Sequence, residues 1–458
     1  MKRILLISHS YKLEGGAELS LLATVKAITK AGHFCHVILP KEGTFADELN
    51  SLGIEYSIES YTWSAMSSYD SDAHLSPGIA LFNADSIIHA HDCITKLKID
   101  LVITNTIMPP WHAYAAKALG IPNIMMIRES YDKRNSTRLL PLAEEYLDNI
   151  NHTMDYVLYN SHYTQGMYQS YISKPKSGVY YPVVDVPDTF ASLTNTHLSS
   201  LSNKVSIITP GSIVEHKNQL ELLEAIVELK SRGISNFHVT IMGYADKKGY
   251  IDILKKYVKK HAIQDLVLFL DFSNKPLQEI SKHDIVVVPS RSEAFGRVTL
   301  EGQLLGRLVI GCNSGGTLEL IEHQKTGLLY TGGEPSSLAD ELEWVLHNKK
   351  RAISISQSGQ KYAKEKFLTE KAYTPILSAI DALLSKPRSS KRIPYYDPVY
   401  ALIQRNLHVN SILNDYANAL GDAKKQIEEN SSVRKLTKKK TRVVIKKITH
   451  KLTRKNKN

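Results

Sequence analysis

Apolar and polar positions alternate in a regular way along most of the chain. In the first part, short runs of mainly apolar residues have the length of buried strands, and the segments between them have the spacing of amphipathic helices. The expected strands are residues 4–8, 34–39, 101–104, 123–127 and 156–159, and the expected helices include 17–31 and 110–119. This alternation is typical of an open parallel sheet. Between Tyr61 and Ser86 it fades, and we expect a loop there.

A polar stretch at residues 187–204, rich in Ser, Thr and Asn, interrupts the pattern and predicts a linker. The alternation then restarts. The expected strands are 205–209, 238–242, 267–270, 285–288 and 308–311, and the expected helices include 219–232, 248–261, 297–305 and 338–347. Residues 353–367 and 371–385 have the pattern of two more helices, which we expect to pack back and close the second lobe.

The pattern predicts the α/β fold class, with two Rossmann-like, doubly wound parallel-sheet domains that face a cleft. We place the first domain at residues 1–186 and the second at 205–385, followed by a basic, partly helical extension at 386–458. A length of 458 residues suits two cores better than one. Ligands of such sheets bind at the carboxyl ends of the strands, so the cleft is the expected site.

Composition narrows the class of protein. Hydrophobic residues make up 43% and charged residues 22%, which are ordinary values for a soluble protein. Cys35, Cys93 and Cys312 form no disulfide or metal-binding pattern, as expected in a reducing cytosol. The first ten residues resemble a strand more than a secretion signal, and no run approaches the roughly 18 apolar residues of a membrane span. We therefore expect a cytoplasmic protein.

The formal charge of +11 is concentrated at the end of the chain. From Ser432 onward there are 12 basic residues and no acidic one, and the rest has 45 basic against 46 acidic residues. A helix in 432–458 with apolar residues on one face could lie on an anionic membrane, at the inner face of the plasma membrane. A solvated, disordered tail is the competing interpretation. Nucleic-acid binding is disfavoured because the tail has no aromatic residue for stacking.

A glycine-bearing segment follows the first expected strand of each half. Gly15 and Gly16 precede a helix, where backbone N–H groups favour an anion. Gly211 and Ser212 are followed by Lys217, which can reach a diphosphate as a point charge. The competing interpretations are a tight turn for the glycines and a solvated first-turn lysine.

Two glutamates, Glu293 and Glu301, lie eight residues apart after the expected strand 285–288. Carboxylates accept hydrogen bonds from sugar hydroxyls, and the N–H groups at a helix start hold phosphate. The helix start here is formed by Phe295, Gly296, Arg297 and Val298. Two surface glutamates would be the alternative, but their position at a strand end favours sugar binding.

Two further motifs are expected on the same edge. Gly315 and Gly316 follow the strand 308–311 and should open another helix, although a plain turn is also compatible with the pattern. Arg128 follows the strand 123–127 of the first half, where it can position a phosphate or an acceptor, or form an ordinary ion pair with Glu129.

No motif indicates a metal site or a serine nucleophile. The histidines lack a metal-binding spacing, and there is no GxSxG elbow. Asp70 and Asp72 have the spacing of a cation-binding pair, but they stand in a serine-rich stretch, which favours solvated side chains. We expect neither a metal nor a cofactor.

Taken in order, these motifs resemble the retaining, nucleotide-sugar-dependent glycosyltransferases of family four, which have the glycosyltransferase-B fold. The likeness runs from Met1 to about Ser385 and is strongest over 205–330. It implies transfer of a hexose-type sugar from a nucleoside-diphosphate sugar to a glycan or lipid-linked acceptor, in cell-surface polysaccharide or glycoconjugate synthesis. It does not imply an oligomeric state.

The resemblance also implies residue roles. Lys217 would contact the donor diphosphate, Glu293 the transferred sugar and Glu301 the ribose. Backbone N–H groups at 295–298 and at Gly16 would hold phosphate, and the nucleobase would lie near Asp271 and Phe272.

The chain departs from the family pattern in several places. Ser212 stands where an arginine is common, and Arg128 where many members have a histidine, so Arg128 can replace the missing charge. Ala294 and Leu318 replace a usual glycine and a usual proline. These departures leave two alternatives: a nucleotide-sugar epimerase of the same fold, and a non-catalytic module that binds sugar nucleotides.

Overall fold

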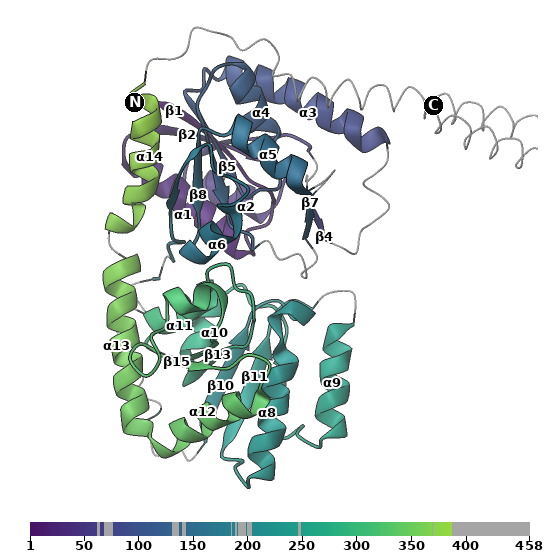
Figure 1. Ribbon diagram of the computed structural model, residues 1–458, viewed down its shortest axis with the longest axis vertical. Coiled ribbons are helices and arrows are strands. Elements are labelled where there is room, and N and C mark those ends of the chain that lie inside the picture. Colours follow the sequence, from purple (N-terminus) through teal and green to yellow (C-terminus); the bar gives the residue numbers. More distant parts are fainter. Residues whose placement is uncertain are drawn as a thin grey trace, which may run out of the picture.

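The structure, a computed structural model, describes residues 1–61, 65–67, 77–130, 137–139, 143–184, 186–187, 190, 198, 204–245, 249–368 and 370–386. Within these ranges the chain forms two lobes, each built on a parallel sheet (Figure 1). The predicted fold class is confirmed. The basic tail, 432–458, lies outside the described residues, as does most of the expected linker and the Asp70–Asp72 pair.

The first lobe contains a seven-stranded sheet in the order β3-β2-β1-β5-β6-β8-β9. Its strands are β1 (Arg3–Ile7), β2 (Phe34–Leu39), β3 (Glu55–Ile58), β5 (Leu101–Asn105), β6 (Asn123–Ile127), β8 (Tyr156–Tyr159) and β9 (Lys176–Val179). Its helices are α1 (Gly16–Lys30), α2 (Thr44–Ser51), α3 (Pro77–Lys96), α4 (Trp111–Ala118), α5 (Ala143–Thr153) and α6 (His162–Tyr168). A small antiparallel pair joins β4 (Ala65–Ser67) to β7 (Thr137–Leu139).

The second lobe contains a six-stranded sheet in the order β12-β11-β10-β13-β14-β15. Its strands are β10 (Val205–Pro210), β11 (Phe237–Met242), β12 (Val267–Leu270), β13 (Ile285–Val288), β14 (Leu308–Cys312) and β15 (Leu328–Tyr330). Its helical segments are η3 (Glu215–Lys217), α8 (Gln219–Ser231), α9 (Tyr250–Lys260), α10 (Pro276–Ser281), α11 (Arg297–Leu304), η4 (Gly315–Glu319), α12 (Pro335–His347) and α13 (Lys349–Phe367).

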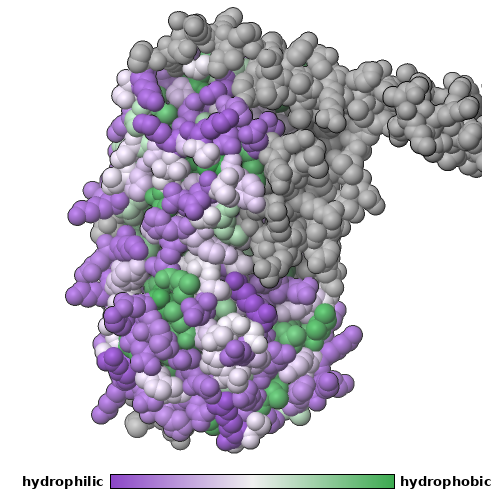
Figure 2. All heavy atoms as spheres, viewed as in Figure 1, coloured by the Kyte–Doolittle hydropathy of each residue, from purple (hydrophilic) through white to green (hydrophobic). Residues whose placement is uncertain are grey.

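The central strands are apolar throughout because helices cover both faces of each sheet. In the second lobe, one face packs against α8, α9 and α12, and the other against α11 and α13. Alternate residues of β13 point to opposite faces, so Ile285 and Val287 join the first of these cores and Val286 and Val288 the second. On the face shown in Figure 2, apolar side chains form only small, separate patches.

The last helix corrects one prediction. After η5 (Glu370–Tyr373), α14 (Thr374–Leu384) was expected to close the second lobe, but it packs on the first. Ile376, Ala379 and Ile380 lie in one core with residues of β1, α1 and α2. In Figure 1, α13 runs beside the second lobe and α14 continues beside the first. The end of the chain therefore ties the two lobes together, as the apolar face of α14 covers the first sheet.

The stretch from Tyr61 to Ser86 gives a second correction. It was expected to be a loop, but α3 begins at Pro77 and runs to Lys96. Proline is favoured in the first turn of a helix because it lacks only an N–H that would be unsatisfied there. Ala90 and Ile94 lie in the core of the first lobe, which explains why the helix is part of the fold although its apolar pattern is weak. None of the helices among the described residues is long and apolar enough to span a bilayer.

Candidate active site

The site lies where the order of the strands reverses in both sheets. β1 and β5 are neighbours in the first sheet, and β10 and β13 are neighbours in the second. At such positions the connections leave in opposite directions, so the loops after the strands open a crevice. Loops from both lobes line an open cavity of about 450 Å³. Its lining includes Gly16, Arg128, Ser212, Lys217, Phe272, Glu293, Phe295, Gly296, Arg297, Val298 and Glu301.

Lys217 and Glu293 meet inside this cavity. Lys217 ends η3, after β10, and Glu293 lies in the loop after the neighbouring strand β13. The Nζ of Lys217 donates to Oε1 of Glu293 over 2.6 Å. Burial alone would raise the pKa of Glu293, but Lys217, together with Ser290 and His216, brings it below its usual value. Glu293 is therefore ionised at neutral pH and forms an ion pair with Lys217, which a ligand with both an anionic group and hydroxyls can replace.

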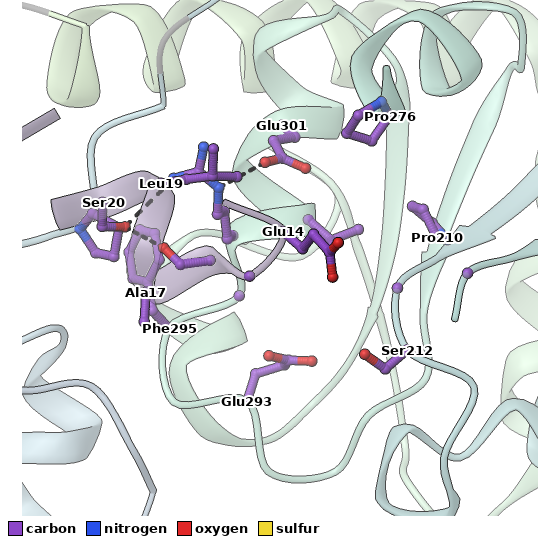
Figure 3. A pocket seen from close by; sticks show the side chains of 18 of the residues that line it. Glu14, Ala17, Leu19, Ser20, Pro210, Ser212, Pro276, Glu293, Phe295 and Glu301 are labelled. Atoms are coloured by element: carbon purple, nitrogen blue, oxygen red, sulfur yellow. Dashed lines mark hydrogen bonds and ion pairs between the residues drawn. The ribbon is translucent and has the colours of Figure 1, made fainter. Parts of the chain in front are cut away.

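Glu301 and Arg297 form a second pair in the same cavity. Gly296 precedes α11 with a φ of +97°, a conformation that favours glycine, and this turn brings Arg297 into the first helical position. The Nε of Arg297 donates to Oε1 of Glu301 over 2.8 Å. Burial raises the pKa of Glu301, and Arg297 opposes this only in part. In Figure 3 the carboxylates of Glu14, Glu293 and Glu301 and the side chain of Ser212 border the same space.

The first lobe contributes a buried cation. Arg128 follows β6, is 8% exposed, and donates from Nε to Oδ1 of Asn105 over 2.6 Å. Burial lowers its pKa to about 10, so the guanidinium is still charged at neutral pH. The carboxylate of Glu129 accepts from the backbone N–H groups of Arg128 and Ile107. The guanidinium of Arg128 thus donates to Oδ1 of Asn105 and to Sδ of Met126 while it lines the cavity.

The glycines expected near phosphate have two different environments. Gly16 begins α1 and lines the cavity, and a Cβ there would lie 3.2 Å from Cδ of Arg297. Gly315 and Gly316 are not among the lining residues, and they open a 3₁₀ segment, η4, where a helix was expected. The N–H of Gly316 donates to the carbonyl of Glu293 over 2.8 Å. This pair therefore supports the Glu293 loop from behind.

Of the two residues predicted to lie near the nucleobase, Asp271 and Phe272, only one lines the cavity. Phe272, which follows β12, lines the cavity and is 46% exposed, whereas Asp271 is not among the lining residues. A second cavity of about 840 Å³ adjoins the first and shares Phe272, Arg297 and Glu301 with it. Its other walls come from α1, α2 and residues 273–278.

Some lining residues were missed by the sequence analysis. Asn160 follows β8, and its Nδ2 donates to the carbonyl of Arg128 over 2.9 Å. Tyr244 follows β11 and is 61% exposed, which is unusual for a large aromatic residue. Both stand within two residues of a strand end, so a search of every strand end for polar or aromatic residues would have found them.

Comparison with known proteins places the chain among sugar-transferring enzymes. Residues 197–362 match the family described as "Glycosyl transferases group 1", and residues 14–186 match "Glycosyltransferase Family 4". Together the two matches cover more than two thirds of the chain.

Two similar proteins are mannosyltransferases. The GDP-mannose-dependent alpha-(1-6)-phosphatidylinositol monomannoside mannosyltransferase of Mycobacterium tuberculosis is 27% identical over 240 residues, which cover 49% of this chain and 61% of the relative. The human alpha-1,3/1,6-mannosyltransferase ALG2 is 29% identical over 270 residues, which cover 54% of this chain and 63% of ALG2. The matches thus span less than two thirds of the length of these relatives.

Two solved structures share the fold. Anabaena Alr3699/HepE, in complex with UDP and glucose, superimposes with a TM-score of 0.67 at 21% identity, over 83% of this chain and 100% of that one. A glycosyltransferase from Rickettsia africae gives a TM-score of 0.68 at 20% identity, over 84% of this chain and 99% of the other.

Proposed function

The chain belongs to family four of the glycosyltransferases, and on this premise we propose that it transfers a hexose-type sugar from a nucleoside-diphosphate sugar to a glycan or lipid-linked acceptor. One observation carries the proposal. The cavity is lined by three carboxylates, Glu14, Glu293 and Glu301, and by three cations, Lys217, Arg297 and Arg128, and both lobes contribute to each set. Carboxylates suit hydroxyl groups, and cations suit a diphosphate.

The Lys217–Glu293 pair would be exchanged for contacts with the donor. Lys217 would turn to the diphosphate, and Glu293 would accept hydrogen bonds from hydroxyls of the transferred sugar. Because both groups are already charged and 2.6 Å apart, the donor replaces one set of charge-assisted contacts by another. Glu301, near the first turn of α11, would accept from the ribose hydroxyls, and the N–H groups at 295–298 would hold phosphate.

The chemistry follows from the charge that develops. When the bond between the anomeric carbon and the diphosphate oxygen breaks, the sugar gains oxocarbenium character and the diphosphate gains negative charge. Lys217 and Arg128 would stabilise that charge, and fixed groups of this kind contribute about 2.7–4 kcal/mol each in other enzymes. These cations would supply the stabilisation without a metal ion.

We propose retention of configuration. The acceptor oxygen would bond to the anomeric carbon on the face that the diphosphate leaves, and the acceptor proton would pass to a phosphate oxygen of the leaving group. Glu293 is not assigned as a nucleophile, because attack by the acceptor on the face that the diphosphate leaves needs no covalent bond to an enzyme carboxylate. Approach of the two lobes would exclude water from the reacting carbon.

The nature of the relatives guides the choice of substrates. One relative depends on GDP-mannose, and one structural neighbour holds UDP and glucose. We therefore expect GDP- or UDP-linked hexoses as donors. A lipid-linked acceptor would bring the reaction to the inner face of the plasma membrane, where the tail 432–458 can bind anionic lipid.

Nucleoside diphosphate release tests the proposal. The full chain is incubated with GDP-mannose, UDP-glucose and related donors, with and without membrane extract. Release that requires an acceptor is expected. Conversion of donor alone to an isomeric nucleotide sugar would point to an epimerase, and binding without any turnover would point to a non-catalytic module. A variant that ends at residue 431 is expected to lose membrane association, and unchanged association would refute the role of the tail.

A further inference from the structure

The loop that carries Glu293 is held by the opposite lobe. The hydroxyl of Ser130, in the first lobe, donates to the carbonyl of Ser292 over 3.3 Å. The hydroxyl of Thr164 donates to the carbonyl of Ala294 over 3.1 Å, and that of Ser161 also reaches this carbonyl. Both peptide neighbours of Glu293 are therefore hydrogen-bonded to first-lobe hydroxyls.

Glu319 makes the return contact from the second lobe. Its carboxylate accepts from the backbone N–H groups of His162 over 3.0 Å and Tyr163 over 2.7 Å. Tyr181, just after β9, donates to the same carboxylate over 2.7 Å. A carboxylate at the beginning of a helix is favourable because the first N–H groups have no partner within the helix. Glu319 thus attaches η4 to the start of α6.

The two sets of contacts are connected through η4. Gly316 and Glu319 are both in η4, and the N–H of Gly316 donates to the carbonyl of Glu293. A Cβ on Gly316 would lie 2.6 Å from Cα of Phe295, so this segment can follow the Glu293 loop closely only with glycine there. Any movement of α6 relative to the second lobe therefore acts on the Glu293 loop from both sides. We call Ser130, Ser161, Thr164 and Glu319 the clasp.

We propose that the clasp positions Glu293, so that its carboxylate takes its working place only when the two lobes are together. This inference rests on the proposed function, since it concerns the same site. None of the four clasp residues is among those lining the cavity, so they are positioning residues rather than catalytic ones. Ser161 and Thr164 are fully buried, which makes their hydroxyl contacts insensitive to competition from water.

The main test removes hydroxyls without removing the helix cap. Ser161 caps α6 by accepting from the N–H of Thr164, so it is left intact. The double variant S130A/T164V, and separately E319Q, are made in the full chain. We expect kcat to fall by about a hundredfold in the double variant, since a displacement of about 1 Å at a reacting group can cause such a loss. The Kd for GDP or UDP should be unchanged.

Three comparisons separate positioning from general damage. T164S keeps the hydroxyl that T164V removes, so its kcat should be close to that of the wild-type chain. K30A breaks the exposed pair between Lys30 and Glu370, which lies away from the Glu293 loop, and should leave kcat unchanged. The fraction of donor that is hydrolysed rather than transferred should rise in the clasp variants, because a loosened loop admits water.

Amide exchange provides a readout that does not depend on turnover. The clasp holds the carbonyls of Ser292 and Ala294, so exchange at residues 292–294 should be faster in S130A/T164V than in the wild-type chain, whereas GDP or UDP should still slow exchange at residues 295–298 in both. Folded clasp variants with wild-type kcat, hydrolysis fraction and exchange would overturn the proposal. If the wild-type chain turns over no donor, the proposed function is at fault, and the exchange comparison alone then supports or overturns the clasp.

Discussion

The two lobes share an architecture but contribute to the cavity in different ways. The second lobe supplies two ion pairs, Lys217–Glu293 and Arg297–Glu301, on the loops after β10 and β13. The first lobe lines the cavity with Glu14, a glycine turn and one buried arginine, and its clasp hydroxyls hold the Glu293 loop from outside the cavity. Paired charges in one lobe suit a donor that exchanges with them, and a lone cation with hydroxyls in the other suits charge stabilisation and closure.

This difference predicts unequal effects of mutation. Groups that would touch the donor in the second lobe should matter most for turnover, and the first-lobe cation less. The apolar face of α14, which packs on the first lobe, should affect stability more than chemistry.

The largest expected effect is that of E293Q. We expect turnover to fall by about 100- to 1,000-fold, the loss seen when a fixed polar group at a transition state is removed. Nucleotide binding should be kept, because the substitution frees Lys217 from its partner. E322Q, which changes an exposed glutamate paired with Lys325, is the matched control and should be neutral. Near-normal turnover in E293Q would remove Glu293 from the site.

The next comparison sets Lys217 against Arg128. Loss of the lysine in K217M should weaken both turnover and nucleotide binding, whereas R128L should lower turnover by about a hundredfold and leave binding nearly intact. With a pKa of about 10, Arg128 stays charged across the neutral range, so the ratio of wild-type to R128L activity should be constant between pH 6 and 8. A steady-state pH series measures this ratio. Equal binding losses in both variants would contradict the division between the lobes.

The attachment of α14 to the first lobe predicts an effect on stability. Ile380 is fully buried among residues of the first lobe, so I380A should lower the free energy of unfolding by about 2–4 kcal/mol. Leu368 is 41% exposed, and L368A serves as the control. Limited proteolysis should show the first lobe of I380A cleaved before the second. The opposite order would mean that α14 stabilises the second lobe.

The smallest effect concerns Glu301 and pH. Burial raises its pKa, so the folded chain binds this proton more tightly than the unfolded chain. Stability therefore falls as pH rises from the ordinary value near 4.5 through the raised value. In E301Q this decrease should be absent, and urea unfolding at several pH values above 4.5, beside the wild type, would show it. If stability fell more steeply with rising pH in E301Q than in the wild type, the pKa of Glu301 could not be raised by folding.

The sequence predicts the central strands well because they are continuous apolar runs. β2, β6, β8 and β13 have the predicted bounds, and so does the edge strand β12, whose sequence VLFL is apolar. The edge strands β3, with the sequence EYSI, and β9, with the sequence KSGV, were missed because they lack such an apolar run. Helix α3 was missed because its apolar residues do not fall on one clear face.

The candidate site also has a part that the sequence predicts and a part that it does not. Lys217, Glu293 and Glu301 could be found because each stands at a fixed place after a strand, within a run of local sequence. The clasp could not, because Thr164 and Ala294 are 130 residues apart and nothing near either residue indicates the other. Contacts between lobes depend on how two finished domains meet, which local patterns do not encode.

The central claim is that groups from both lobes surround one bound donor. A crystal structure of the full chain with GDP or UDP tests it most directly. We predict the diphosphate within hydrogen-bonding distance of the Lys217 amino group, with the ribose on the Glu301 carboxylate and Arg128 facing the phosphates. A nucleotide bound elsewhere, with the Lys217–Glu293 pair still intact, would contradict the account.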